Sequence, residues 1–458
     1  MSKGPIKTLN PATGEVLAEY PELTDTELEA KVAAAHAAYP AWRDSGFADR
    51  AALMASAARV LRRDVADLAR LITLEMGKPI KEARGEVEKC AWVCDWYAEN
   101  AALLLQPEPA PSDAKKSFVR FDPLGVILAV MPWNFPFWQV FRFAAPTLMA
   151  GNVGMLKHAE SSMGCAKAIE DVFRKAGCPE GVFTALMLRR DRIDKLIHDR
   201  RVMGVSLTGS VEAGRSVGRA AGDALKPCVL ELGGSDPFVV LADVDLDKAT
   251  TGAVAGRMIN TGQSCIAAKR FIVEAPVYEA FVEGFAKKIG ALVIGDPLDE
   301  KTQIGPLART EFVEPLHDQV VRSVQAGARL VIGGKRVGAK GAYYAPTLLA
   351  DVTPGMAAFD EETFGPVAAV VRARDAEHAV ALANQTVFGL GASIWTGDPG
   401  RGEKLAARIE AGHVAVNGTV RSDPRLPFGG IKDSGYGREL SRYGILAFVN
   451  TKTVWVGA

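Results

Sequence analysis

Short apolar runs alternate with longer segments of helical periodicity along most of the chain. The runs at 126–130, 153–156 and 202–207 have the length and the Val, Ile and Leu content of buried strands. Amphipathic segments at about 163–176 and 211–223 follow the last two of these runs. This alternation predicts an α/β fold in which helices connect the strands of a doubly wound parallel sheet.

The pattern at the two ends of the chain differs from that of its centre. Thr24 and Glu27 form the signature of a capping box, and helical patterns follow to Ala38, from 49 to 76 and from 81 to 105. These three helices read as covering layers. The strand–helix style is repeated after Gly233, which predicts a second α/β lobe. Its expected strands lie at 238–241, 271–273, 329–332, 367–371 and 393–395.

Two extended segments belong to neither lobe. Residues 108–124 begin with a proline-rich break and continue with strand-like alternation, and 450–456 has the pattern of an edge strand. We therefore expect 1–107 with 125–231 to form one lobe and 232–434 the other. We expect 108–124 and 435–458 to be bridging segments that serve oligomerisation.

Composition excludes several classes of protein. The 458 residues carry 54 basic and 54 acidic side chains and are 48% hydrophobic, so no nucleic acid partner is expected. The longest apolar run, 124–132, is too short to span a membrane, and residues 1–5 contain no apolar signal core, so no signal peptide is expected. Six scattered Cys suggest a reducing compartment, and we expect a cytoplasmic protein. No His or Cys cluster has metal-ligand spacing, so no metal is expected.

Three side chains have the types that acyl chemistry requires. Cys265 lies in a small polar turn before an apolar strand, where it is either a buried apolar side chain or a nucleophile. Glu231 ends a strand before two glycines, and it is either a solvated strand end or a general base. Asn134, flanked by aromatic residues and prolines, is either a turn residue or an oxyanion donor.

Other polar residues suit binding. The turn at Gly209 and Ser210 joins a strand to a helix, where a phosphate can bind. Lys157 and Glu160 follow another strand and form either a surface ion pair or a ribose site; a carboxylate there would repel a 2′-phosphate. Arg142, among aromatic residues, pairs either with a substrate carboxylate or with an internal acid.

Seven motifs in order resemble the aldehyde dehydrogenase superfamily over nearly the whole chain. The details are similar to its bacterial succinate-semialdehyde dehydrogenases, especially the run Gly-Gln-Ser-Cys-Ile-Ala-Ala-Lys-Arg. The motifs lie at Pro132–Pro136, Lys157 with Glu160, Thr208–Ser210, Glu231–Gly234, Gly262–Cys265, Glu361–Pro366 and Pro427–Lys432.

The resemblance implies a mechanism and roles for residues. Cys265 attacks the aldehyde, Asn134 and the Cys265 backbone N–H hold the oxyanion, hydride passes to nicotinamide, and Glu231 activates the water that hydrolyses the thioester. Residues 1–107 and 125–231 become the NAD-binding domain and 232–434 the catalytic domain. The implied cofactor contacts are Trp133, Lys157, Glu160, Gly209, Ser210, Glu362 and Phe364.

The resemblance also implies the ligands. Glu160 favours NAD over NADP. Arg142, Trp138 and Ser422 are the implied substrate contacts, and succinic semialdehyde is the expected small-molecule aldehyde. A homodimer or homotetramer is expected. The alternatives are a broad-specificity aldehyde dehydrogenase with a structural Arg142, and a cofactor-binding relative without turnover.

Overall fold

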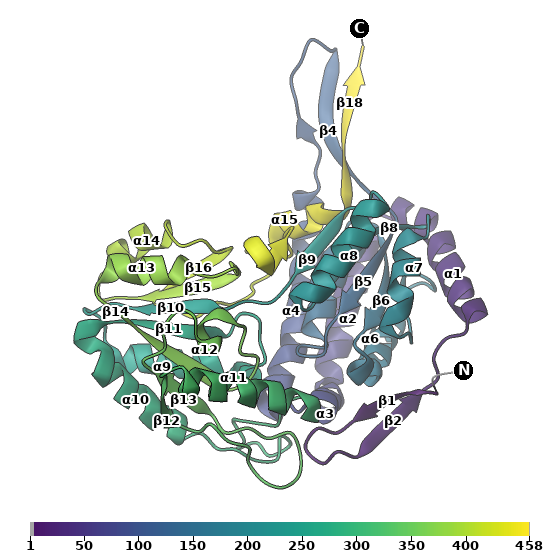
Figure 1. Ribbon diagram of the computed structural model, residues 1–458. Coiled ribbons are helices and arrows are strands. Elements are labelled where there is room, and N and C mark those ends of the chain that lie inside the picture. The colour runs from purple at the N-terminus through teal and green to yellow at the C-terminus, as the bar shows by residue number, and fades with distance from the viewer. Residues whose placement is uncertain (1–3, 458) are drawn as a thin grey trace.

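A parallel sheet lies at the centre of each of two lobes in the computed structural model, which describes residues 4–457 (Figure 1). The sheet of the first lobe has six strands. The edge strand β17, the last of them in the sequence, pairs antiparallel with β9, and the other five strands run parallel. In spatial order they are β17 (Gly435–Tyr436), β9 (Cys228–Glu231), β8 (Val202–Thr208), β5 (Val126–Met131), β6 (Val153–His158) and β7 (Phe183–Ala185). The expected doubly wound α/β fold is confirmed.

Helices cover both faces of this sheet (Figure 1). The capping box at Thr24 and Glu27 is present, but the helix that it starts continues to Asp44. The expected helix from 49 to 76 is divided at Asp64, which caps one helix and begins the next. The helices are α1 (Asp25–Asp44), α2 (Phe47–Arg63), α3 (Val65–Met76), α4 (Ile80–Leu104), α5 (Trp138–Met149), α6 (Met163–Lys175), α7 (Ile193–His198) and α8 (Val211–Asp223).

The second lobe is built on a seven-stranded sheet, parallel except at one edge, where β12 and β13 are antiparallel. The strands in spatial order are β12 (Arg329–Ile332), β13 (Thr347–Ala350), β14 (Val367–Ala373), β11 (Ala268–Glu274), β10 (Asp236–Val240), β15 (Gly391–Trp395) and β16 (His413–Val416). The helices are α9 (Leu246–Met258), α10 (Tyr278–Gly290), α11 (Val313–Gln325), α12 (Ala357–Asp360), α13 (Ala376–Asn384) and α14 (Pro399–Ala406). The fully buried faces of β10 and β11 explain why their sequences read as continuous apolar runs.

A three-stranded arm projects away from both lobes (Figure 1). In it β18 (Val449–Val456) and β3 (Glu108–Pro109) pair antiparallel with the two edges of β4 (Lys116–Pro123). The segment 435–448, which we expected to belong to the bridging part, lies instead on the first lobe. Its strand β17 extends the six-stranded sheet, and Tyr97 of α4 donates to the carbonyl of Ser441 at the start of α15 (Ser441–Ile445). An antiparallel hairpin of β1 (Ile6–Leu9) and β2 (Val16–Tyr20), which the sequence pattern did not predict, precedes α1.

Within residues 4–457, none of the helices combines the length and the apolar character that crossing a bilayer requires.

Candidate active site

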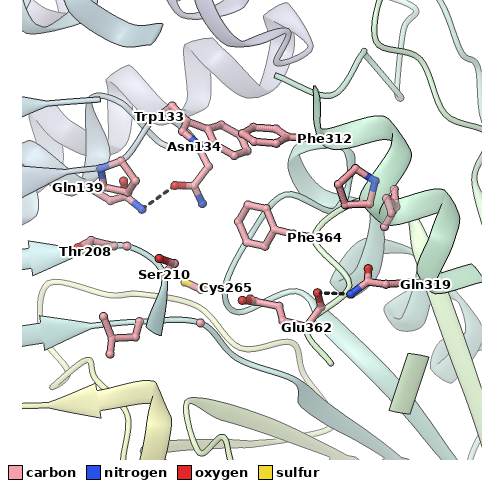
Figure 2. Close-up of a pocket in the computed structure, with 16 residues that line it drawn as sticks. Trp133, Asn134, Gln139, Thr208, Ser210, Cys265, Phe312, Gln319, Glu362 and Phe364 are labelled. Atoms are coloured by element: carbon pink, nitrogen blue, oxygen red, sulfur yellow. Dashed lines mark hydrogen bonds between the residues drawn. The ribbon is translucent and has the colours of Figure 1, made fainter. Parts of the chain in front are cut away.

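A cavity of about 360 Å³ is bordered by residues of both lobes. The first lobe contributes the ends of β5 and β8, and the second contributes the turn before β11 and the loop before β14 (Figure 2). The cavity therefore lies at the carboxyl ends of parallel strands, where open α/β sheets bind ligands. Its lining is Pro132, Trp133, Asn134, Gln139, Thr208, Gly209, Ser210, Leu232, Gly233, Cys265, Phe312, Pro315, Leu316, Gln319, Glu362 and Phe364.

Cys265 reaches this cavity from a turn with unusual backbone geometry. Asn260 and Thr261 adopt left-handed φ values of 52° and 56°, and Gly262 follows at 74°. A Cβ at Gly262 would lie 2.2 Å from the carbonyl oxygen of Gly365, so the close approach requires glycine. The turn thus places a half-buried thiol at the wall of the cavity.

The electrostatics around Cys265 are mixed. Burial raises the pKa of its thiol to about 12, and the positive charges of Arg142 and Lys269 oppose that rise. Lys269 is fully buried, and its Nζ donates to the carbonyls of Ser264, Cys265 and Ala267 at 3.0, 2.8 and 3.1 Å. The ammonium therefore both fixes the turn and favours the thiolate.

Asn134 is held rigidly beside the same turn. Its Oδ1 accepts from Gln139 Nε2 at 3.1 Å, which turns the Nδ2 amide group towards the carbonyl of Gln263, also at 3.1 Å (Figure 2). The backbone carbonyl of Asn134 accepts from Asn260 Nδ2 at 2.8 Å. A fixed amide donor next to Cys265 is the arrangement that stabilises an oxyanion.

Glu231 lies at the end of β9, outside the cavity lining. Its side chain is buried, and neither carboxyl oxygen has a hydrogen-bond partner among the described residues. Burial raises its pKa well above the ordinary value; Arg142 opposes this rise and Glu439 adds to it. The carboxyl group is therefore a buried acid that no hydrogen bond locks in place.

Arg142 has a carboxylate partner within the protein. It lies in α5, 2% exposed, and its guanidinium forms an ion pair with Glu439. It also donates to Thr208 Oγ1 at 3.2 Å and lies 4.6 Å from the centre of the Phe428 ring. The charge has an internal partner, so the structure places Arg142 in an internal ion pair, where a substrate carboxylate was expected.

The glycine turn after β8 opens the cavity to a helix N-terminus. Ser210 caps the 13-residue α8 by accepting from the backbone N–H of Ala213 at 3.2 Å, and Gly209 precedes it. Both residues line the cavity that also holds Cys265. A phosphate group bound here would meet the positive end of the helix dipole.

Lys157 and Glu160 follow β6, in the same lobe as this turn. Lys157 is buried, which lowers its pKa, while Glu160 opposes that effect. Glu160 remains partly exposed, and its Oε2 lies 3.9 Å from Nε of Arg189, which also pairs with Glu22 at 2.6 Å. The carboxylate expected at a ribose thus has a cationic neighbour.

The other wall carries Glu362 and Phe364. Glu362 Oε1 accepts from the backbone N–H of Gly234 at 3.1 Å and lies 3.4 Å from Lys269 Nζ. Phe364 packs edge-on against Trp133 with ring centres 5.7 Å apart. In Figure 2 Trp133 lies on one side of Phe364 and Glu362 on the other, and all three side chains border the cavity.

Phe312 and Gln319 are among the lining residues that were not expected from the sequence. Phe312 stacks on Trp133 with ring centres 5.1 Å apart, and Gln319 of α11 donates to the carbonyl of Glu362 at 3.3 Å. Both come from a stretch whose pattern indicates only an ordinary amphipathic helix, and no motif marks them. No three His, Cys, Asp or Glu side chains gather as a metal site would need in the part of the chain described.

Trp138 and Ser422, the two remaining expected substrate contacts, are brought together by a residue that the sequence did not single out. Lys89 of α4 donates from Nζ to Ser422 Oγ at 2.7 Å and lies 4.1 Å from the centre of the Trp138 ring. Its signal was present, because Lys89 lies one turn after Glu86 on the inward face of a helix read as a covering layer.

The donor set of the cavity fits a nicotinamide dinucleotide. The N-terminus of α8, the aromatic rings of Trp133, Phe312 and Phe364, and the carboxylate of Glu362 all border one cavity with Cys265. A Cβ at Gly233 would come within 2.3 Å of Glu362 Oε2, so the backbone there leaves room only for that carboxylate.

Known proteins resemble this chain over nearly its whole length. A model described as "Aldehyde dehydrogenase family" matches residues 1–454. The chain is 49% identical to succinate semialdehyde dehydrogenase (NAD(P)+) Sad of Escherichia coli, with 98% of this chain and 97% of the relative covered. It is 49% identical to succinate-semialdehyde dehydrogenase (NADP(+)) 1 of Mycobacterium ulcerans, with 99% and 100% covered. A crystal structure of succinic semialdehyde dehydrogenase from Streptococcus pyogenes with NADP+ has a TM-score of 0.97 at 37% identity, with 99% and 100% covered.

Proposed function

Because this chain belongs to the aldehyde dehydrogenase family, we propose that it oxidises an aldehyde to a carboxylic acid with a nicotinamide dinucleotide as cofactor. The observation that carries the proposal is the meeting of Cys265 and the fixed Asn134 amide in one cavity with the N-terminus of α8. A nucleophile, an oxyanion donor and a phosphate site together support covalent oxidation better than binding alone.

Cys265 is the proposed nucleophile. Its sulfur bonds to the aldehyde carbon as a thiolate, so the thiol must first lose the proton that burial retains. The aldehyde oxygen then becomes an anion, which the Asn134 amide and the Cys265 backbone N–H stabilise. A bound nicotinamide dinucleotide supplies the hydride acceptor that the oxidation requires. After oxidation the acyl group is held as a thioester on Cys265.

Glu231 is the proposed base for hydrolysis of the thioester. Water adds to the acyl carbon, Glu231 accepts its proton, and the bond from carbon to the Cys265 sulfur breaks to release the acid. Because both carboxyl oxygens of Glu231 lack hydrogen-bond partners in the described chain, turning towards Cys265 breaks no hydrogen bond. Burial raises its pKa, which makes the ionised carboxylate a stronger proton acceptor.

We propose that the first lobe is the cofactor domain and that NAD is preferred. Ser210 and Gly209 would hold the pyrophosphate, Lys157 and Glu160 the adenosine ribose, and Glu362 with Phe364 and Trp133 the nicotinamide end. The carboxylate of Glu160 supports NAD by repelling a 2′-phosphate. Two observations favour NADP instead. The names of some relatives include NADP, and the positive charge of Arg189 beside Glu160 weakens the repulsion of a 2′-phosphate.

The proposed substrate is succinic semialdehyde. Two relatives at 49% identity carry succinate semialdehyde in their names, and Lys89 contacts both Trp138 and Ser422, which supports one polar binding surface. A broad-specificity aldehyde dehydrogenase is the second candidate, and the internal ion pair of Arg142 favours it.

Formation of NADH from succinic semialdehyde and from butanal, an uncharged aldehyde of the same chain length, tests this proposal. A strong preference for succinic semialdehyde supports the first candidate, equal rates support the second, and no NADH or NADPH from either contradicts both. Cys265→Ala should abolish oxidation and retain NAD binding. Residual turnover in that variant would remove Cys265 as the nucleophile.

We also propose that the chain forms a homodimer or homotetramer through its projecting arm and works in the cytoplasm. The exposed Trp455 and Val456 on β18 support the first statement. Six cysteines without disulfides suit the reducing compartment that the second requires.

A further inference from the structure

Hydrogen-bond donors from two helices and one loop converge at Lys89. Lys89 Nζ from α4 donates to Ser422 Oγ at 2.7 Å, which leaves the hydroxyl proton of Ser422 for another acceptor. The ammonium lies 4.1 Å from the centre of the Trp138 ring at the start of α5. Trp138 is 4% exposed, and its Nε1–H has no acceptor among the described residues. Such a buried donor normally has one.

The charge of Lys89 has no counter-ion, unlike its neighbours. Arg142 is paired with Glu439, and Lys78 is paired with Glu86, both buried. Lys89 forms no ion pair with any carboxylate in residues 4–457, although it is mostly enclosed.

The nearest acids are already committed to other groups. Glu86 accepts from Lys78 and from the backbone N–H groups of Phe137 and Trp138, and Asp423 pairs with Arg425 at 2.6 Å. A partly buried ammonium without a carboxylate partner is costly, and an anion that binds from outside would lower this cost.

We propose that Lys89, Ser422 and Trp138 form a subsite that binds the carboxylate at the far end of the aldehyde substrate. The inference rests on the proposed function and deepens it by assigning a cation other than Arg142. Trp138 links the subsite to the cavity through α5, where the next residue, Gln139, lines the cavity and holds the oxyanion donor Asn134. A carboxylate would accept from the ammonium, the hydroxyl and the indole N–H together.

The experiment compares kcat/KM for succinic semialdehyde with kcat/KM for butanal in four proteins. Lys89→Met removes the charge and keeps the length of the side chain, and the ratio of the two values should fall about 10- to 100-fold. Lys89→Arg should restore part of the ratio. Lys81→Met, an exposed lysine on the same helix, is the matched control and should leave the ratio unchanged.

Equal losses on both aldehydes, or an unchanged ratio in Lys89→Met, would overturn the subsite. Ser422→Ala provides a second reading if Lys89→Met does not fold, and its ratio should also fall. An unchanged ratio in Ser422→Ala alongside an unfolded Lys89→Met would likewise overturn it.

A separate measurement distinguishes failure of the subsite from failure of the proposed substrate. If the unmodified enzyme does not prefer succinic semialdehyde, inhibition of butanal oxidation by succinate tests whether the subsite still binds a carboxylate. Inhibition that weakens about tenfold in Lys89→Met keeps the subsite for another carboxylated aldehyde. Equal inhibition of the unmodified enzyme and Lys89→Met would contradict both the carboxylate subsite and succinic semialdehyde as the substrate.

Discussion

A single carboxylate, Glu160, carries the proposed choice of cofactor. Glu160→Ser removes the charge that would repel a 2′-phosphate, so the ratio of kcat/KM for NADP to that for NAD should rise about tenfold or more. Arg189, 3.9 Å away, would then offer its charge to the phosphate. Steady-state kinetics with both cofactors measures the ratio. If the ratio stays constant, Glu160 does not lie at the ribose.

Lys89 should make substrate preference depend on pH. Burial lowers its pKa to about 8, Arg142 on α5 lowers it further, and Glu86 and Cys90 on α4 and Asp423 after β16 oppose them. The ammonium is therefore charged below about pH 8 and loses its charge as the pH rises through that value.

The preference for succinic semialdehyde over butanal should accordingly fall between about pH 7 and pH 9. Taking the ratio cancels the ionisation of Cys265, because both aldehydes need the same thiolate. Lys89→Arg should keep its ratio flat over this range, since a guanidinium stays charged. A ratio that falls equally in both proteins would assign the titration to another group.

For single residues, the sequence predicts which side chains are chemically important better than it predicts which residues they contact. It singled out Cys265 and Asn134 because the turn around Cys265 and the prolines flanking Asn134 are local features. The structure brings both side chains to one cavity. It left Arg142 open between a substrate and an internal acid, because the answer depends on Glu439, almost three hundred residues later. Lys89 was missed for the same reason, since Ser422 is distant in sequence.

Among the elements, the turn before β11 depends on one lysine. Lys269 begins that strand and holds three carbonyls of the turn while pairing with Glu362 at 3.4 Å. Lys269→Met should lower kcat/KM about 100-fold, because small misplacements of a nucleophile are costly. It should also shift alkylation of Cys265 by iodoacetamide to higher pH, because a positive charge that favours the thiolate is lost.

The neighbouring Arg270 supplies the control for Lys269. It is equally buried and also donates to three carbonyls, those of Ser235, Leu382 and Ala383, none of them in the turn. Arg270→Met should reduce stability, yet the folded fraction should keep the alkylation profile of the unmodified protein. If the pH profile of Cys265 alkylation is the same in the unmodified protein, Lys269→Met and Arg270→Met, the charge of Lys269 does not influence the thiol.

Element positions were predicted well where the apolar pattern is local and continuous. The strands β5 and β12 and the helix α6 lie within a residue of the expected bounds, because buried runs and amphipathic faces mark them directly. The division at Asp64 was not predicted, since the hydrophobic face continues across it. The pairing of β17 with β9 was also beyond reach, because two residues carry no periodicity.

For the whole molecule, the arm determines the assembly that we propose. Its outer strand leaves Trp455 58% and Val456 43% exposed, and it extends away from both lobes (Figure 1). Apolar side chains on a projecting sheet are a typical surface for association with a second copy. Trp455→Lys places a charge on that surface and should weaken the assembly.

Size-exclusion chromatography with light scattering measures the effect as mass. The unmodified protein should elute at a multiple of 48.8 kDa, and Trp455→Lys should shift towards 48.8 kDa as the concentration falls. Val387→Lys is the matched control, because Val387 is also 58% exposed but lies on the second lobe, before β15. An unmodified chain that elutes at 48.8 kDa would contradict the proposed assembly. If Trp455→Lys and Val387→Lys change the mass equally, the result would contradict an interface formed by the arm.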